Sequence, residues 1–85
     1  MTTTVQLPKR FYQDHAARDL PAGVVVKETK RHVVVELDPA EFAELLDDAN
    51  HYVAIGGPGG FLDAEYRGLV ASARATVAAL RKVAP

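Results

Sequence analysis

The chain has 85 residues, no cysteine and a formal net charge of −1. This length suits one domain with a single apolar core, and a content of 48% hydrophobic and 25% charged residues excludes a disordered chain. The missing cysteines exclude a disulfide framework and a cysteine zinc site, and the near-neutral charge excludes a strongly basic nucleic-acid binder. Because neither a secretory signal nor an apolar run of about 18 residues is visible, we expect a cytoplasmic protein without a membrane span.

The first part of the chain predicts a strand followed by a helix. Residues 2–7 are rich in β-branched side chains and are a candidate third strand, although a chain end equally frays. Pro8 suits the first turn of a helix, which we expect over about 8–19, before the Leu-Pro-Ala-Gly break at 20–23. His15 falls on the thin apolar side of this helix, where a packed, hydrogen-bonded histidine is more common than a metal ligand.

Residues 24–37, VVVKETKRHVVVEL, predict an antiparallel hairpin because two valine triplets flank a polar centre. One long strand is the alternative. The turn near 28–31 has no Gly or Asn, which favours a four-residue loop over a two-residue primed turn. One face of each strand is apolar: Val24 and Val26 on the first, and Val33, Val35 and Leu37 on the second. Each triplet also places a valine on the opposite face, so either both faces are partly covered or the sheet meets another subunit.

A second helix is predicted over 39–52. Asp38 is the N-cap, Pro39 the first helical residue, and Glu41 completes an arrangement like a capping box. The apolar residues of this helix recur at helical spacing and form one stripe: Phe42, Leu45, Leu46, Ala49 and Val53.

The segment Gly-Gly-Pro-Gly-Gly at 56–60 predicts a flexible joint before a third helix over 63–82, capped by Asp63. The joint lacks the Lys and Ser or Thr of a phosphate-binding loop, so we interpret it as a plain connection. Together the elements predict a small α+β protein, one domain over 1–85, whose short antiparallel sheet packs with three helices.

The charges are segregated along the chain. Residues 1–37 carry +2, residues 38–66 carry −7, and residues 67–85 carry +4. We therefore expect the second and third helices to recognise each other, or a second copy, with arginines of the last helix answering the aspartates near the end of the helix before it.

Catalytic and metal-binding patterns are weak. Ser72 lies on an alanine-rich helix without a nucleophile-elbow motif. His15 with Asp19, and His51 with Asp47, have helical i, i+4 spacing, but a zinc site needs three or four converging ligands. We expect no catalytic residue, no cofactor and no metal, and hence no enzyme.

The favoured hypothesis is a non-enzymatic protein-interaction module that forms a homo-oligomer, or binds another protein, through the sheet face and the final helix. Its candidate interaction residues form the apolar stripe of that helix, unless they are simply intramolecular core: Tyr66, Leu69, Val70, Ala73, Val77 and Leu80. The alternative is a nucleic-acid-binding regulator with a basic and aromatic N-terminal segment and a basic hairpin tip. Its candidate contacts are Lys9, Arg10, Lys30 and Arg31.

Alanine and valine make up 25 of the 85 residues, and arginine outnumbers lysine six to four, a usage typical of GC-rich coding sequences. The stretches KRFYQDHAARDLPAG and GLVASARATVAALRK resemble small uncharacterised proteins of actinobacteriophages and actinobacteria. The resemblance covers the two ends of the chain and transfers no site residues. It implies a phage-encoded accessory or host-modulating protein that acts by binding a host or phage macromolecule.

Overall fold

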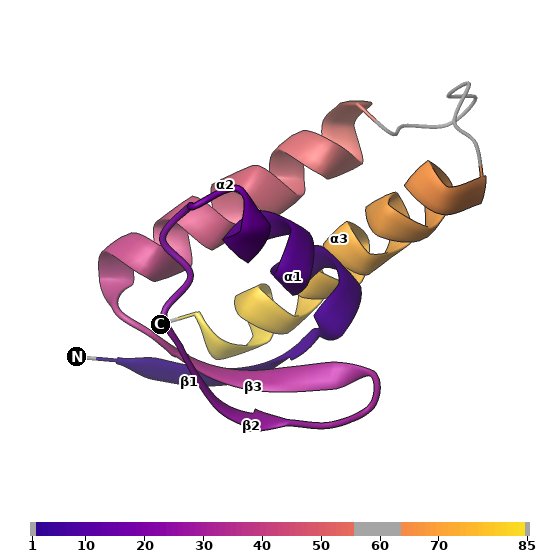
Figure 1. Cartoon of the computed structure of the whole chain (residues 1–85). Helices are drawn as coiled ribbons and strands as arrows, with labels where there is room; N and C mark the ends of the chain where they lie inside the picture. Colours follow the sequence, from indigo (N-terminus) through magenta and orange to yellow (C-terminus); the bar gives the residue numbers. More distant parts are fainter. Residues whose placement is uncertain (1, 56–63, 85) are drawn as a thin grey trace.

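A three-stranded antiparallel sheet carries three helices on one of its faces (Figure 1). The computed structural model describes residues 2–55 and 64–84. Its elements, in chain order, are β1 (Thr3–Pro8), α1 (Lys9–Ala17), β2 (Val24–Glu28), β3 (His32–Leu37), α2 (Pro39–Ile55) and α3 (Ala64–Val83). The α+β class is therefore confirmed, including the third strand. The joint at 56–60 and the cap at Asp63 lie outside the described residues.

The hairpin strand β3 is the central strand of the sheet, and the order is β1-β3-β2. β1 pairs antiparallel with β3 from Thr3 opposite Leu37 to Pro8 opposite His32. The predicted four-residue loop at 28–31 is shorter in the structure, where only residues 29–31 lie between the strands. The Thr29 side chain closes this turn by accepting a hydrogen bond from the His32 N–H over 3.1 Å.

A β-bulge interrupts the pairing of β2 with β3. Val25 lies opposite Val35, but the next pair joins Lys27 to Val34, so Val26 is the extra residue. At the start of β2, Gly23 adopts a φ of 70°. A Cβ at this position would collide with the carbonyl oxygen of Glu36, so a glycine is needed where the chain enters the sheet.

Two helix ends show how local sequence sets the element boundaries. At the start of α2 the predicted capping box is confirmed, since Glu41 N–H donates to Asp38 Oδ1 over 2.7 Å and Asp38 N–H donates to Glu41 Oε1 over 2.8 Å. The first helix is shorter than the predicted 8–19. It ends at Ala17 because Asp19 takes a left-handed φ of 59°, a conformation that terminates helices.

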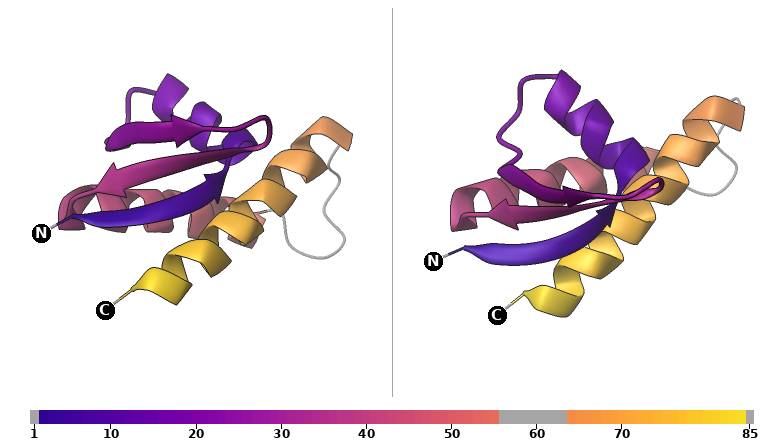
Figure 2. Two further views of the ribbon diagram at one scale, coloured as in Figure 1. Left: turned by 90° about the horizontal axis from the view of Figure 1, so that it is seen from below. Right: turned by 60° about the horizontal axis from the view of Figure 1, so that its bottom comes forward.

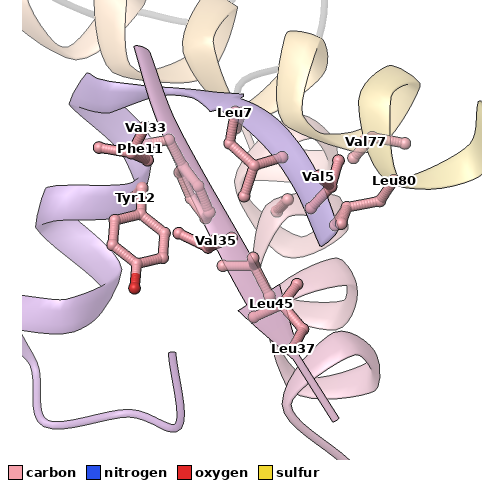
Figure 3. Close-up of a cluster of buried hydrophobic side chains, with 12 residues drawn as sticks. Val5, Leu7, Phe11, Tyr12, Val33, Val35, Leu37, Leu45, Val77 and Leu80 are labelled. Atoms are coloured by element: carbon pink, nitrogen blue, oxygen red, sulfur yellow. The ribbon is translucent and has the colours of Figure 1, made fainter. Parts of the chain in front are cut away.

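Helices α2 and α3 pack side by side and run in opposite directions, and α3 also packs against β1 (Figure 1). Seen from the sheet side, the described helices lie behind the strands and leave the other sheet face uncovered (Figure 2). The core fills the space between the sheet and the helices (Figure 3). It takes side chains from β1, β3 and all three helices: Val5, Leu7, Phe11, Tyr12, Val33, Val35, Leu37, Leu45, Ala49, Ala73, Val77 and Leu80.

The two hairpin strands differ in burial. Val33, Val35 and Leu37 of β3 share the buried face, as predicted. In β2, however, Val24, Val25 and Val26 are 64%, 44% and 49% exposed. The central strand is covered by helices, whereas β2 lies at the edge of the sheet and packs almost entirely on β3.

Candidate functional site

The four basic residues named as candidate nucleic-acid contacts come together in the structure. Lys9 and Arg10 begin α1, and Lys30 and Arg31 form the tip of the β2–β3 hairpin. With Gln13 they line one hollow of about 410 Å³, which we call the basic hollow. The backbone joins its two sides, because the Lys9 N–H donates to the Arg31 carbonyl oxygen over 2.9 Å.

Strand register explains why the two basic segments meet. Pro8, the last residue of β1, lies opposite His32, the first residue of β3. The chain turns into α1 directly after Pro8, so the first helical turn lies beside the hairpin tip. From α3, the Ser72 hydroxyl accepts a hydrogen bond from the Phe11 N–H over 3.0 Å and so caps α1. Ser72 therefore has a structural role that the sequence did not reveal.

The cations of the basic hollow are held to different degrees. The Lys9 ammonium forms an ion pair with Glu28 Oε1 at 2.7 Å and donates to the Thr29 carbonyl oxygen at 2.9 Å, which clamps α1 to the hairpin. The Arg10 guanidinium lies against Gly68 of α3, where a Cβ would come within 3.2 Å of it. Lys30 and Arg31 are exposed, and neither forms an ion pair within the described part of the chain. These two tip residues are the cations available to a ligand.

The aromatic residues next to these cations are not available to a ligand. Phe11 is fully buried and Tyr12 is 5% exposed, and both belong to the core. Of the basic and aromatic N-terminal segment, Lys9 and Arg10 therefore lie at the surface side of α1, whereas the two aromatic rings lie beneath it in the core.

A second polar group, buried between α1 and α2, centres on His15. Its side chain is fully buried, its Nδ1 lies 2.7 Å from Asp48 Oδ2, and its Nε2 lies 2.8 Å from the Pro21 carbonyl oxygen. Each ring nitrogen therefore lies within hydrogen-bond distance of an oxygen, one from a carboxylate and one from a backbone carbonyl. The expectation of a packed, hydrogen-bonded His15 is thus confirmed. With both nitrogens engaged, the ring has no free position for proton transfer to a substrate.

Arg18 holds Asp48 from the other side. Its guanidinium makes two bonds to the Asp48 carboxylate, at 3.1 and 2.5 Å, and a third to Asp14 at 3.2 Å. Tyr52 completes the group: its hydroxyl donates to Asp14 over 3.1 Å and its ring lies 5.1 Å from the Arg18 guanidinium carbon. We call His15, Arg18 and Asp48, with Asp14 and Tyr52, the His15–Asp48 cluster.

The cation that answers Asp48 differs from the one expected. We predicted that arginines of the last helix would answer the aspartates near the end of α2, but the partner is Arg18, just after α1. On the described part of α3, Arg67, Arg74 and Arg81 are exposed and form no ion pair with the described residues of α2. Helix α1 lies across α2 at this point, so Arg18 and not an arginine of α3 lies next to Asp48.

Electrostatics make the cluster sensitive to acid. Burial by itself raises the pKa of Asp48, but the hydrogen bonds and charges of Arg18 and His15 outweigh it, so the pKa of Asp48 lies below its ordinary value. A carboxylate whose pKa is depressed by folding stabilises the protein above its unfolded pKa of about 3.9 and loses that contribution as the pH falls through the folded pKa.

We therefore expect the free energy of unfolding to fall as the pH is lowered below about 4, more steeply in the wild type than in Asp48→Asn. Urea unfolding followed by circular dichroism at a series of pH values checks this. Parallel pH curves for the two proteins would show that Asp48 is not the titrating group.

The predicted interaction stripe on α3 lies inside the molecule. Val70, Ala73, Val77 and Leu80 are at most 9% exposed, and Leu69 is half-buried against the core. The Tyr66 side chain lies outside the described residues. We had named intramolecular core as the alternative for this stripe. That alternative fits the five residues whose side chains are described, because they face α2 and the sheet.

The two pairs of possible metal ligands considered in the sequence analysis are not joined by further ligands in the described structure. Among residues 2–55 and 64–84, no three His, Asp or Glu side chains are grouped so that they could hold a metal ion. None of the described helices is both long enough and apolar enough to span a bilayer.

No protein-family model, curated protein or solved structure matches the chain. We therefore infer function from the surfaces of the described residues, above all from the exposed valines of β2 and from the basic hollow.

Proposed function

We propose that the protein is a small non-enzymatic interaction module that forms a homodimer by pairing β2 with β2 of a second copy. The observation that carries the proposal is the exposure of Val24, Val25 and Val26, at 64%, 44% and 49%, on a strand at the sheet edge. An edge strand presents unpaired backbone N–H and C=O groups, and valine favours strand pairing. The other edge strand, β1, has α3 packed on it instead.

Self-pairing is favoured because this strand complements itself. In an antiparallel pair centred on Val25, a two-fold axis places Val25 opposite Val25 and Val24 opposite Val26 of the second copy. All three exposed valines of each copy then have a valine partner, which is a favourable cross-strand pair.

The charges around the valines are also complementary. Lys27 follows the triplet, and Glu36 of β3 lies beside Val24 in the sheet. The Val25-centred pairing brings Lys27 of each copy toward Glu36 of the other, so two pairs of opposite charge flank the valines. These charges select the register, since exposed ion pairs each contribute only about 0–1 kcal/mol.

The expected affinity is modest. Burying a half-exposed valine contributes roughly 1 kcal/mol, so six valines across the interface contribute roughly 5–6 kcal/mol. Association costs about 4–15 kcal/mol, so the backbone hydrogen bonds between the strands decide the balance. With an association cost at the low end of that range and about 4 kcal/mol from the backbone hydrogen bonds, the net is about 5–6 kcal/mol, which corresponds to a dissociation constant of about 40–200 μM.

The bulge at Val26 limits what β2 can pair with. A strand of five residues with a bulge offers a short, twisted edge that cannot template a long ladder. A closed two-fold dimer satisfies that edge completely, whereas an open fibre would need a second free strand edge. The bulge thus disfavours open-ended aggregation through β2 but still allows β2 to pair with β2 of one second copy.

Replacing Val25 with lysine tests the proposal, because it places like charges directly opposite each other on the two-fold axis. Sedimentation velocity over about 5–500 μM should show the wild type moving from the 9.2 kDa chain toward twice that mass. The V25K variant should stay monomeric, with at least about a tenfold weaker association.

Two further variants keep the test interpretable. Val24→Lys replaces the most exposed valine, so it should also abolish the dimer while leaving the fold intact. Ile55→Lys is the matched control, since Ile55 is 52% exposed but lies at the end of α2. A wild type that stays monomeric over the whole range, or a dimer weakened equally by Ile55→Lys, contradicts pairing through β2.

A further inference from the structure

We infer that the basic hollow binds the phosphate backbone of a nucleic acid. This goes beyond the proposed dimer and does not depend on it. The hollow collects Lys9, Arg10, Lys30 and Arg31 from two segments of the chain, with Glu28 as the acidic partner of Lys9. Lys30 and Arg31 are exposed and form no ion pair with another described residue, so the hairpin tip presents two cations in a molecule whose net charge is −1.

The tip of the hairpin is built to present its charges. The backbone of Thr29 and the Thr29 hydroxyl hold His32, which fixes the turn, and the Arg31 carbonyl oxygen is bound to the Lys9 N–H. The Lys30 and Arg31 side chains are exposed, and the backbone that carries them is held in place by these hydrogen bonds. Guanidinium and ammonium groups held in this way suit phosphate oxygens, which arginine binds in a two-pronged fashion.

The surroundings of the hollow favour nucleic acid over a membrane surface. The exposed large apolar residues of the described chain are the three β2 valines, Ile55 and Val83. None of them lines the hollow, so no apolar side chain is placed to enter a lipid layer beside the charges.

The separation of acidic and basic residues on the surface favours one position for a negatively charged ligand. The start of acidic helix α2 and the hairpin tip lie at opposite ends of the sheet (Figures 1 and 2). A polyanion is thus attracted at one end and repelled at the other. Phe11 and Tyr12, which follow Arg10 on α1, are buried, so neither of these two rings is available to stack on bases. The expected binding is therefore to the backbone and independent of base sequence.

The test is fluorescence anisotropy of a labelled duplex and a labelled single strand, each in two unrelated sequences. If the two tip cations neutralise about two phosphates, duplex affinity should fall about 12-fold between about 50 and 200 mM salt, equally for both sequences. The double variant K30E/R31E should bind at least about tenfold more weakly and lose most of that salt dependence.

The matched control is R74E/R81E, which changes the net charge by the same amount. Arg74 and Arg81 are exposed on the side of α3 turned away from Gly68 and Ser72, which face α1. This control should retain affinity within about threefold at the same salt. Inorganic phosphate and polyglutamate serve as competitors that separate a free anion or an acidic protein from a nucleic acid.

The outcomes divide cleanly. Salt-dependent binding that is lost in K30E/R31E and kept in R74E/R81E supports the inference. No binding at low salt, equal weakening in both double variants, or displacement by polyglutamate or phosphate as effective as by unlabelled duplex overturns it. The Val24→Lys variant keeps the two proposals apart. If it loses the dimer but still binds nucleic acid, the basic hollow acts without the β2 pairing, so one proposal can fail while the other holds.

Discussion

Asp48→Ala is expected to lower the free energy of unfolding by about 3 kcal/mol. The substitution removes the acceptor shared by His15 Nδ1 and the Arg18 guanidinium. His15 is fully buried, so its donor would be left without a partner and out of contact with water. A chain of this length has a total stability of about 4–13 kcal/mol, so the loss would be a large fraction of it.

Asp47→Ala is the matched control for this measurement. Asp47 precedes Asp48 on α2 but is exposed. Its removal should change the stability by less than about 0.5 kcal/mol. Asp48→Asn keeps the shape and one acceptor, so it should fall between the two. Urea unfolding at neutral pH measures all three, and an Asp48→Ala protein as stable as Asp47→Ala would show that the cluster does not hold α1 on α2.

Sequence reasoning anticipated the burial of His15 but not its partners. Helical spacing paired His15 with Asp19, four residues away, as two residues considered for a metal site. In the structure Asp19 takes a left-handed φ and ends the helix, and the acid is Asp48, 33 residues further along. Which acid reaches a buried histidine depends on how α1 crosses α2, and no local pattern encodes that crossing.

The elements themselves were predictable because their signals are local. The Asp38–Glu41 box, the valine triplets and the helical stripe of α2 each act within a few residues. The order β1-β3-β2 was not predictable, because it requires a chain end to pair with a strand about 30 residues away. The same pairing creates the basic hollow, since Pro8 opposite His32 brings together two basic segments that the sequence shows only separately.

An apolar stripe on a helix shows that one face is buried, but it does not show what buries it. For α3 the covering surfaces are β1 and α2 of the same chain, so the five described residues of the predicted stripe are buried or half-buried within this chain. For β2 the reverse holds: the valine pattern predicted an apolar face, and the chain contains no described element that covers it. The position of each element in the finished fold, rather than its pattern, separates core from interface.

Leu80→Ala is the substitution that distinguishes these two roles on α3. Leu80 is fully buried in the cluster that includes Val5 and Val77 (Figure 3). Truncating a buried leucine leaves a cavity and costs about 3–4 kcal/mol, so we expect the free energy of unfolding of the monomer, measured in urea, to fall by that amount. The substitution lies away from β2, so the dissociation constant of folded protein should change by less than about twofold.

Val83→Ala on the same helix is the control, because Val83 is 38% exposed and should lose less than about 1 kcal/mol. Unfolding is measured at a concentration well below the dimer range, so that association does not add to the stability. If Leu80→Ala instead weakens association and leaves monomer stability unchanged, then the α3 stripe and not β2 forms the contact between copies. A stability loss without a change in association assigns Leu80 to the core, and the exposed valines of β2 then remain the apolar surface through which two copies can meet.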